Sequence, residues 1–407
     1  MEWKEVRLGD VCEIYGRIGF RGYTTNDLVD TPKEGAISLS PKNIINGELN
    51  LDQCTYIKWD KYYESPEIMI NPNEIIITKT GSSVGRTTFV RRVVHPMTLN
   101  PQLVVLKNIS ENAEFLSYYI KSALFQSVLK SIVVGSAIPT LSQKNLANLI
   151  INVPKEVAYQ RHIASVLSSL DRKIELNNKI NADLEEMAQA IFKNWFVDFE
   201  PFKDGKFVDS ELGMIPEGWK VGTLTEIASY MNGLAMQKYP PENIEDSLPV
   251  LKIKELGQGF CGTDSDRCSC NIKDECKIHN GDVIFSWSGT LLVDVWCGGD
   301  CGLNQHLFKV TSNDYPKWFY YYWTKHHLQE FIHIAKDKAV TMGHIKRGHL
   351  EEALVAIPDN DSMEKAHELF EPILSKMISL RLENSHLSLL RDTLLPRLMS
   401  GELEVPE

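Results

Sequence analysis

The sequence predicts two similar domains of mixed α/β (α+β) class, related by pseudo-two-fold symmetry and separated by two long antiparallel coiled-coil helices. Three observations predict this fold: an internal repeat of about 205 residues, short β-branched runs in the first part of each repeat, and apolar 3-4 spacing in the second. The predicted parts, in chain order, are a first domain (1–155), a first helix (156–200), a linker (201–218), a second domain (219–358) and a second helix (359–401).

Four pairs of segments carry the repeat, and they occur in the same order in both halves. WKEVRLGDVCEI recurs as WKVGTLTEIASY, NEIIITKTGSSVG as GDVIFSWSGTLLV, LNPQLVVLK as LNQHLFKV, and NLANLIINVP as HLEEALVAIP. The matched positions are Trp3 with Trp219, Leu8 with Leu224, Gly81 with Gly289, Asn100 with Asn304, and Pro154 with Pro358. A period of this length makes the repeated unit a whole domain with its helix, and excludes a solenoid of short repeats.

The first part of each repeat has the composition of a mixed sheet and helix domain. Runs such as EIIIT, QLVVL and DVIFS lie between Gly, Pro and Asn residues, which is typical of short strands between turns. One helix is expected at AEFLSYYIKSALFQSVLK and one at its counterpart, PKWFYYYWTKHHLQEFIHIA.

The second part of each repeat predicts a helix of about 35 residues, roughly 50 Å long. Apolar residues recur at the 3-4 spacing of a coiled coil, and asparagines interrupt the stripe in both copies, where buried polar groups fix register. The predicted seam contains Leu167, Leu170, Ile174, Asn181, Leu184, Ile191, Met377, Leu380, Asn384, Leu387 and Leu394, with Asn181 equivalent to Asn384. Each helix has one apolar stripe to bury, so we expect the two to pair antiparallel; the alternative is that each packs only on its own domain. The polar segment Glu200 to Pro216 is expected to be the linker.

Composition and charge restrict the function. No run approaches 18 apolar residues and the first residues lack a secretory core, which predicts a cytoplasmic chain with mostly reduced cysteines and no membrane partner. The net charge of −11 argues against simple phosphate neutralisation, but residues 1–155 carry 17 basic and 15 acidic side chains. DNA binding by such a chain requires local basic faces and help from partner subunits.

The two helical segments and their flanks carry a family resemblance. The stretches LSSLDRKIELNNKINADLEEMAQAIFKNWFVDFEPF, PEGWK and LLPRLMSGEL resemble the specificity subunits of type I restriction-modification systems. The resemblance covers the whole chain and is most specific in the helices. It implies a non-catalytic subunit with two target-recognition domains, each reading one half of a split, asymmetric site in double-stranded DNA.

The resemblance also implies which partners carry out the chemistry. Two methyltransferase subunits would dock on the helices and restriction subunits would join them, forming an adenine-N6 DNA methyltransferase and ATP-dependent endonuclease. This chain would need no cofactor, and S-adenosylmethionine, ATP and Mg would belong to the partner subunits.

The sequence offers no convincing catalytic site. GSSVGRT, from Gly81 to Thr87, has three residues between its glycines and Arg86 in place of Lys, so it is not a phosphate loop. A loop that contacts DNA phosphate through backbone N–H groups, Ser82 and Arg86 remains open, as does a purely structural turn. Neither YPPE at Tyr239 nor the acidic residues after Pro358 have the order that a methyltransferase or nuclease needs.

Six of the eight cysteines lie between Cys261 and Cys301. Their spacings do not form paired C-x₂-C knuckles, and the first domain has no equivalents. We therefore expect packed or exposed thiols and no metal ligands; a structural zinc site is the alternative.

Candidate DNA contacts are positions that the repeat places in equivalent loops. Arg and Lys bind guanine or phosphate, and Gln and Asn pair with adenine. In the first domain these residues are Arg17, Arg21, Tyr23, Lys42, Asn43, Lys79, Ser82, Arg86 and Lys144. In the second they are Gln237, Lys238, Lys252, Lys254, Trp287, Ser288, Thr290, Lys346 and Arg347.

Two other functional classes remain open. One is a DNA-reading subunit of another defence system, or a phage-encoded subunit that competes for methyltransferase partners. The other is a protein–protein adaptor, which the acidic balance favours and the paired helices disfavour.

Overall fold

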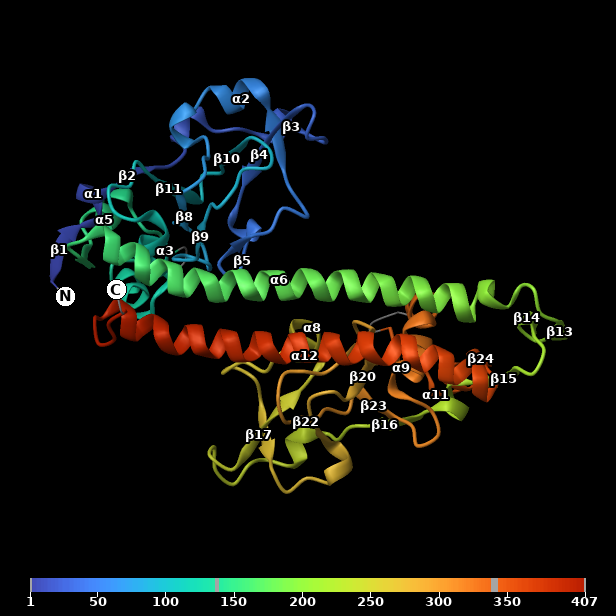
Figure 1. Ribbon diagram of the computed structural model, residues 1–407. Helices are drawn as coiled ribbons and strands as arrows, with labels where there is room; N and C mark the ends of the chain where they lie inside the picture. The colour runs from blue at the N-terminus through green and yellow to red at the C-terminus, as the bar shows by residue number, and fades with distance from the viewer. Residues whose placement is uncertain (1, 136–138, 338–342, 406–407) are drawn as a thin grey trace. The chain divides into compact units, whose positions relative to one another are not determined.

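The computed structural model describes residues 2–135, 139–337 and 343–405. The chain divides into two compact units: unit 1 comprises Met1–Arg172 with Ser388–Glu407, and unit 2 comprises Lys173–Leu387. Each unit contains one predicted domain and a part of each long helix (Figure 1). Among the described residues, no helix combines the length and apolar character needed to cross a membrane.

Unit 1 contains two four-stranded sheets and two short strand pairs. One sheet has the order β2 (Glu13–Tyr15), β11 (Leu103–Lys107), β8 (Ile75–Thr78), β9 (Thr87–Phe89); the other has the order β10 (Met97–Leu99), β4 (Gly35–Leu39), β7 (Tyr56–Lys58), β3 (Leu28–Val29). The pairs are β1 (Trp3–Arg7) with β12 (Ile150–Pro154), and β5 (Ile44–Ile45) with β6 (Glu48–Leu49). The helices are α1 (Leu8–Val11), α2 (Trp59–Tyr63), α3 (Ala113–Lys121), α4 (Ala123–Ser131) and α5 (Gln143–Ala147).

Unit 2 repeats this plan. Its sheets have the orders β16 (Ser229–Asn232), β23 (Leu307–Thr311), β20 (Val283–Ser286), β21 (Leu292–Val295), and β18 (Arg267–Ser269), β17 (Ser247–Leu251), β22 (Cys301–Leu303), β19 (Lys277–Ile278). The end strands β15 (Lys220–Thr223) and β24 (Leu354–Ile357) pair as β1 and β12 do. Its helices are α7 (Leu224–Ile227), α8 (Ile253–Gln258), α9 (Lys317–His326), α10 (Leu328–Asp337) and α11 (Arg347–Glu352).

The two units share most of their strand order, which confirms the internal repeat. The second sheet differs in its outer strand, which is β3 beside β7 in unit 1 and β19 beside β22 in unit 2. In each unit, one parallel pair of strands, β4 with β10 or β17 with β22, lies among antiparallel pairs. The continuous apolar run of β8 is explained by burial on both faces of its sheet. Ile75 and Ile77 of β8 pack in the core that contains Phe115 of α3, whereas Ile76 between them packs in the core that contains Ile37 of β4.

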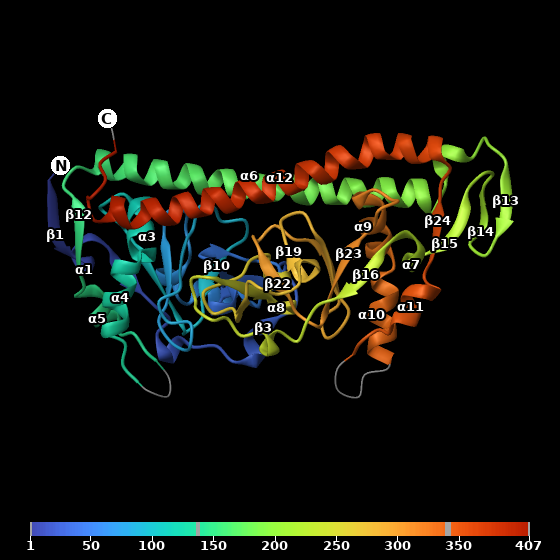
Figure 2. The same ribbon diagram turned by 90° about the horizontal axis from the view of Figure 1, so that it is seen from below.

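The prediction of one helix at residues 113–130 was wrong, because the chain breaks it at Ser122. Ser122 has extended backbone angles (φ −62°, ψ 149°), and its hydroxyl oxygen accepts a hydrogen bond from Phe125 N at 3.3 Å. Serine is a favoured N-cap because it satisfies an otherwise unpaired amide of the first turn. The second copy is likewise divided, into α9 and α10 (Figure 2).

The two long helices are α6 (Val157–Phe196) and α12 (Asn360–Met399), each of 40 residues and longer than expected. They pair antiparallel in both units (Figures 1 and 2). In unit 1, Arg391 donates to Asp171 at 2.9 Å. In unit 2, Asn177 Nδ2 donates to Asn384 Oδ1 at 2.9 Å, and further along α6 the ring of Phe192 lies 6.3 Å from that of Phe370. The prediction of an antiparallel pair is confirmed.

Burial along the predicted seam agrees with this pairing. Leu167, Asn181, Met377 and Leu380 are buried, and the other predicted members, Leu170, Ile174, Leu184, Ile191, Asn384, Leu387 and Leu394, are partly buried. The polar contact at the seam is made by Asn177 and Asn178 with Asn384, and Asn181 Oδ1 is buried without a partner among the described residues.

The helix pair also packs on the domains, so the alternative arrangement holds in addition to the pairing. Leu167 of α6 and Leu398 of α12 belong to the core of unit 1. In unit 2, Phe370 of α12 stacks on Trp318 of α9, with ring centroids 4.6 Å apart and an interplanar angle of 12°. Unit 1 is therefore built from two separate stretches of sequence, whereas unit 2 is one continuous stretch that contains its parts of both helices.

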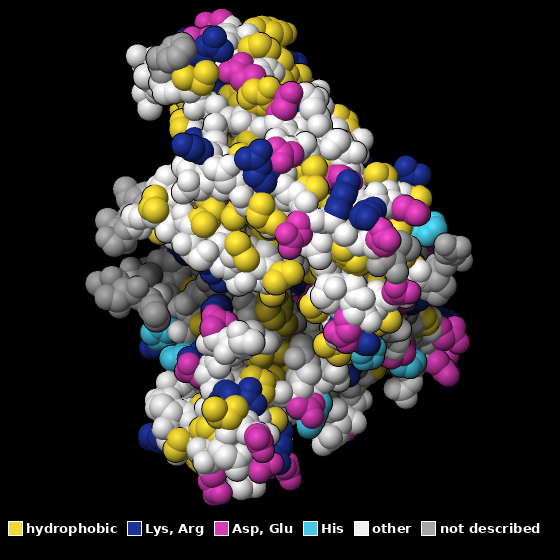
Figure 3. Space-filling model, turned by 90° about the vertical axis from the view of Figure 1, so that its left-hand side faces the viewer, with side chains coloured by type: hydrophobic (Ala, Val, Ile, Leu, Met, Phe, Trp, Pro, Cys, Tyr) yellow, Lys and Arg dark blue, Asp and Glu magenta, His cyan; other side chains and the backbone are white. Residues whose placement is uncertain are grey.

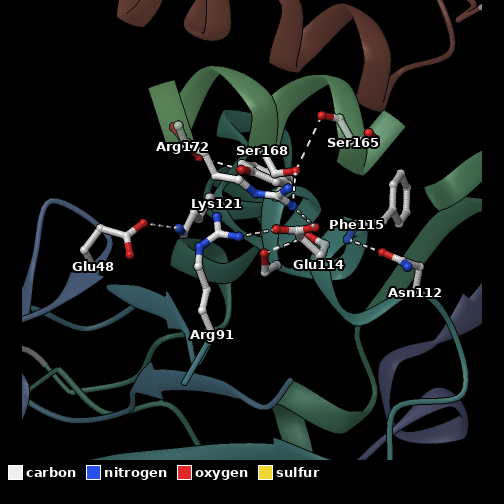
Figure 4. A network of polar contacts seen from close by, with 12 residues as sticks. Glu48, Arg91, Asn112, Glu114, Phe115, Lys121, Ser165, Ser168 and Arg172 are labelled. Carbon is white, nitrogen blue, oxygen red and sulfur yellow. Dashed lines mark hydrogen bonds and ion pairs between the residues drawn. The ribbon is translucent and has the colours of Figure 1, made fainter. Parts of the chain in front are cut away.

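A polar network joins α6 to the domain in unit 1 (Figure 4). Glu114 of α3 accepts from Arg91 and lies 3.8 Å from Arg172 of α6. Arg172 also donates to Ser168 at 3.1 Å. Two arginines around one carboxylate hold the first turn of α3 against the helix.

The segment predicted as a linker contains a hairpin, β13 (Phe207–Ser210) with β14 (Gly213–Pro216). Aromatic contacts attach this region to the end of α6. Phe202 lies 5.5 Å from Trp195 and 4.9 Å from Trp219, between ring centroids. The segment is thus packed within unit 2 along part of its length.

Candidate nucleic-acid interface

In unit 1 the predicted contact loops leave the two sheets at one common edge. Parallel strands β4 and β10 both end there, at Leu39 and Leu99. The other sheet has the end of β8 at the same edge, because Thr78 pairs with Leu103, the first residue of β11. The turn from Asn100 to Leu103 connects the two sheets, so the loops after all these strands lie together.

An open hollow of about 600 Å³ lies at this edge of unit 1. Its lining comes from four segments: 16–18, 79–80, 101–102 and 140–143. Lys79 is fixed there by its backbone, because its N–H donates to Gln102 O and its carbonyl accepts from Leu141 N, both at 2.8 Å. Partial burial lowers the pKa of the Lys79 amine.

Two predicted contacts in unit 1 are buried. The Arg17 side chain is only 4% exposed, and its guanidinium donates to Leu99 O at 2.8 Å and to Thr98 Oγ1 at 3.1 Å. Asn43 is also buried, and its amide donates to Asn50 O at 3.1 Å. In this conformation both side chains support the loops from inside.

The remaining predicted residues of unit 1 lie nearer the surface. Arg21 forms an ion pair with Glu67 at 3.3 Å, and Tyr23 OH lies 2.8 Å from Ser38 Oγ. Four predicted residues have exposed side chains: Lys42, Ser82, Arg86 and Lys144.

The loop from Gly81 to Thr87 does not present its backbone N–H groups as expected. Gly81 N donates to Pro139 O at 3.0 Å, Gly85 N to Thr78 O at 2.9 Å, and Arg86 N to Ser83 O at 3.1 Å. Gly81 and Gly85 have φ values of +101° and +90°, which favour glycine. These three N–H groups are therefore already hydrogen-bonded within the protein and are not free to bind phosphate.

Unit 2 brings its predicted residues to the equivalent edge. Asn304 N donates to Leu251 O at 3.1 Å, as Asn100 N donates to Leu39 O at 2.8 Å. Trp287 takes the place of Lys79, because its carbonyl accepts from Ile345 N at 3.1 Å. The exposed predicted side chains are Gln237, Lys238, Lys254, Thr290, Lys346 and Arg347; Lys252 and Trp287 are partly buried and Ser288 is buried.

Two lysines of this edge are already paired within unit 2. Lys252 forms an ion pair with Asp266, and Lys254 forms one with Asp264 at 2.6 Å. The hydrogen bond to Asp264 raises the pKa of Lys254. Figure 3, which views the molecule from the left-hand side of Figure 1, shows Lys and Arg side chains lying among Asp and Glu on that face. At the edge of unit 2, the two ion pairs offset the positive charge of Lys252 and Lys254.

The cysteines of unit 2 form no metal site among the described residues. Cys268 and Cys276 pack in one apolar cluster, and Cys301 packs in another with Cys261 beside it. Burial raises the pKa of the Cys268 and Cys276 thiols. Such thiols behave as small apolar side chains.

The family model described as the type I restriction modification DNA specificity domain matches residues 1–186 and 216–381. The chain belongs to this specificity family. Each matched stretch contains one copy of the repeat, so the resemblance noted from the helical segments is confirmed for both domains.

Relatives match the chain along its whole length. It is 29% identical to the type I restriction enzyme MjaIX specificity subunit of Methanocaldococcus jannaschii, covering 100% of this chain and 94% of that one. It is 21% identical to the HindI specificity subunit of Haemophilus influenzae, covering 99% and 100%. The crystal structure of the type I S subunit from M. genitalium has the same fold, with a TM-score of 0.56 at 16% identity over 98% and 96% of the two chains.

Sequence reasoning missed residues that line the edge but carry no charge. Gln102 and Gln143 lie at the hollow of unit 1, and His306 lies beside Trp287 in unit 2. A signal was present, because Gln102 and His306 each follow the asparagine that the repeat aligns, Asn100 or Asn304, by two positions. The prediction rested mainly on basic residues and therefore omitted these uncharged ones.

Proposed function

We propose that this chain reads a bipartite, asymmetric site in double-stranded DNA, with one half-site per unit. The observation that carries the proposal is that most of one strand arrangement occurs twice, with equivalent edges that display different side chains. Lys79 in unit 1 corresponds to Trp287 in unit 2. Two similar but non-identical readers suit two short, non-identical half-sites.

The long helices suit a second role, the docking of methyltransferase subunits. Both helices expose apolar side chains along their lengths: Leu176 (52% exposed) and Met187 (45%) on α6, and Leu389 (67%) and Leu390 (47%) on α12. Leu389 and Leu390 are adjacent, and neighbouring exposed apolar side chains are the kind of surface that a protein partner can cover. We expect two methyltransferase subunits there, with restriction subunits joining them.

The chemistry would then belong to the partners. Adenine-N6 methylation with S-adenosylmethionine and ATP-dependent cleavage with Mg would occur in those subunits, while this chain recognises the DNA site. Its net charge of −11 agrees with this division, since partner subunits would provide the missing phosphate contacts. We expect the assembly to act in the cytoplasm, where the host DNA lies.

Mapping of methylated adenines in host DNA, with and without this gene, tests the reading function. The expected result is one motif with two unlike halves and an unread spacer of fixed length. A contiguous motif, or no change in methylation, would reject it. A protein–protein adaptor would show no salt-dependent duplex binding by the assembled complex.

An insertion tests whether the helices set the spacer. Four extra residues at equivalent positions of α6 and α12 lengthen each by about 6 Å. At about 3.4 Å per base pair the preferred spacer should grow by about two base pairs. As a matched control, four residues inserted at the turn between β13 and β14 leave both helices unchanged, and the spacer should stay constant. An unchanged spacer in the helix variant would reject the idea.

A further inference from the structure

Each unit displays one side chain on the same rigid turn at its candidate DNA edge. In unit 1 the N–H of Gln102 donates to Asn100 Oδ1 at 2.9 Å, and in unit 2 the N–H of His306 donates to Asn304 Oδ1 at 3.3 Å. Both turns close with a second hydrogen bond to the asparagine carbonyl, from Leu103 N and Leu307 N. The backbone is therefore the same in both units, and the displayed side chain differs.

The turn of unit 1 holds Gln102 at the hollow beside Lys79. Its carbonyl accepts from Lys79 N at 2.8 Å, and its side-chain Oε1 accepts from Asn100 Nδ2 at 3.2 Å. Because the side chain is exposed while its backbone is bonded, the amide can meet a ligand without loss of core contacts. A glutamine amide can pair with the N6 and N7 atoms of adenine in the major groove.

The turn of unit 2 gives His306 aromatic surroundings. Its ring lies 6.0 Å from that of Trp287, and its Nε2 lies 3.4 Å from Gln305 Nε2. Its Nδ1 is buried and has no hydrogen-bond partner among residues 2–135, 139–337 and 343–405. Because Nδ1 is enclosed, a base edge would meet this half-buried ring on its Nε2 side, where an imidazole N–H can donate to an acceptor.

We infer that Gln102 and His306 are the specificity-determining residues of this turn, each contacting one base edge in the half-site of its own unit. Gln102 suits adenine, and His306 suits a hydrogen-bond acceptor on a purine edge. This inference rests on the proposed reading function. It explains how one fold distinguishes two half-sites, because the turn fixes the position and the side chain decides the base.

The test measures base preference in the assembled complex with its methyltransferase subunits. Binding to duplex libraries randomised in each half-site is compared for the wild type, Gln102→Ala and His306→Ala. We expect each variant to lose preference at one base pair of one half-site, by about 5- to 150-fold, and to keep the other half-site. Lys33→Ala and Glu245→Ala, exposed and at the opposite ends of β4 and β17, are matched controls that should keep both preferences.

A second variant guards against simple damage to the turn. Gln102→Glu keeps the side-chain length, and a carboxylate accepts from cytosine N4, so the preference should move from adenine toward cytosine. Loss of affinity that is equal for all sequences would mean that Gln102 contacts phosphate, and would overturn the inference. Unchanged preference in all three variants would overturn it too. A wild-type complex without sequence preference would instead reject the proposed reading function.

Discussion

Leu374 of α12 offers a clean measure of how strongly the helix pair is bound to unit 2. Its side chain is 1% exposed in the core of that unit, whereas Leu369, on the same helix, is 41% exposed. Leu→Ala removes three hydrocarbon groups at about 0.8 kcal/mol each. The cavity left behind brings the expected loss at Leu374 to about 3–5 kcal/mol, against about 0.5 kcal/mol or less at Leu369.

Thermal unfolding of the purified chain measures both variants under one condition. For a unit of this size the loss at Leu374 corresponds to a fall in Tm of about 6–20 °C, and Leu369→Ala should shift Tm by less than about 2 °C. Both variants make the same chemical change on one helix, so helix propensity cancels between them. Equal shifts would refute the reasoning, because α12 would then contribute no buried contact to unit 2.

Three further outcomes are expected. Asn181→Leu should raise the free energy of unfolding in urea by about 1–3 kcal/mol, because it removes from the seam a buried Oδ1 that has no partner in the described part of the chain; a loss of stability would contradict this. Asp171→Asn should lower it by about 1.5–3 kcal/mol, since the carboxylate accepts from Tyr118 OH at 2.5 Å and from Arg391 at 2.9 Å; an unchanged urea midpoint would argue against the network. Arg86→Ala should weaken duplex binding equally across sequences and reduce the slope against log salt by about 0.9, and a change in base preference would point to base contact instead.

The architecture could be predicted because its signals are local and repeated. Matched glycines and asparagines, such as Gly81 with Gly289 and Asn100 with Asn304, occupy turns that the same backbone needs twice. The apolar 3-4 spacing identified the face of each helix that is buried. It did not give the register, in which Asn384 meets Asn177 and not its repeat equivalent Asn181.

The candidate interface was predicted less completely, since contacts between distant residues leave no local pattern. Arg17 is of a residue type that often contacts DNA, yet its guanidinium donates a hydrogen bond to the carbonyl oxygen of Leu99, 82 positions away in the sequence. The exposed Gln102, on the turn after Asn100, was not predicted as a contact because it carries no charge. Charge patterns find phosphate contacts more readily than base contacts, which depend on placement.

The division of both long helices between two cores has a consequence for synthesis on the ribosome. Leu398 and Met399 complete the core that begins with Leu8 and Val11, and Trp3 lies against Gly401. The first-made domain therefore waits for almost the whole chain to be translated before its last apolar contacts form. Domains often fold in order of synthesis, and here the earlier one stays open to chaperones for longest. Premature termination before Ser388 would leave both domains translated but the earlier one unfinished.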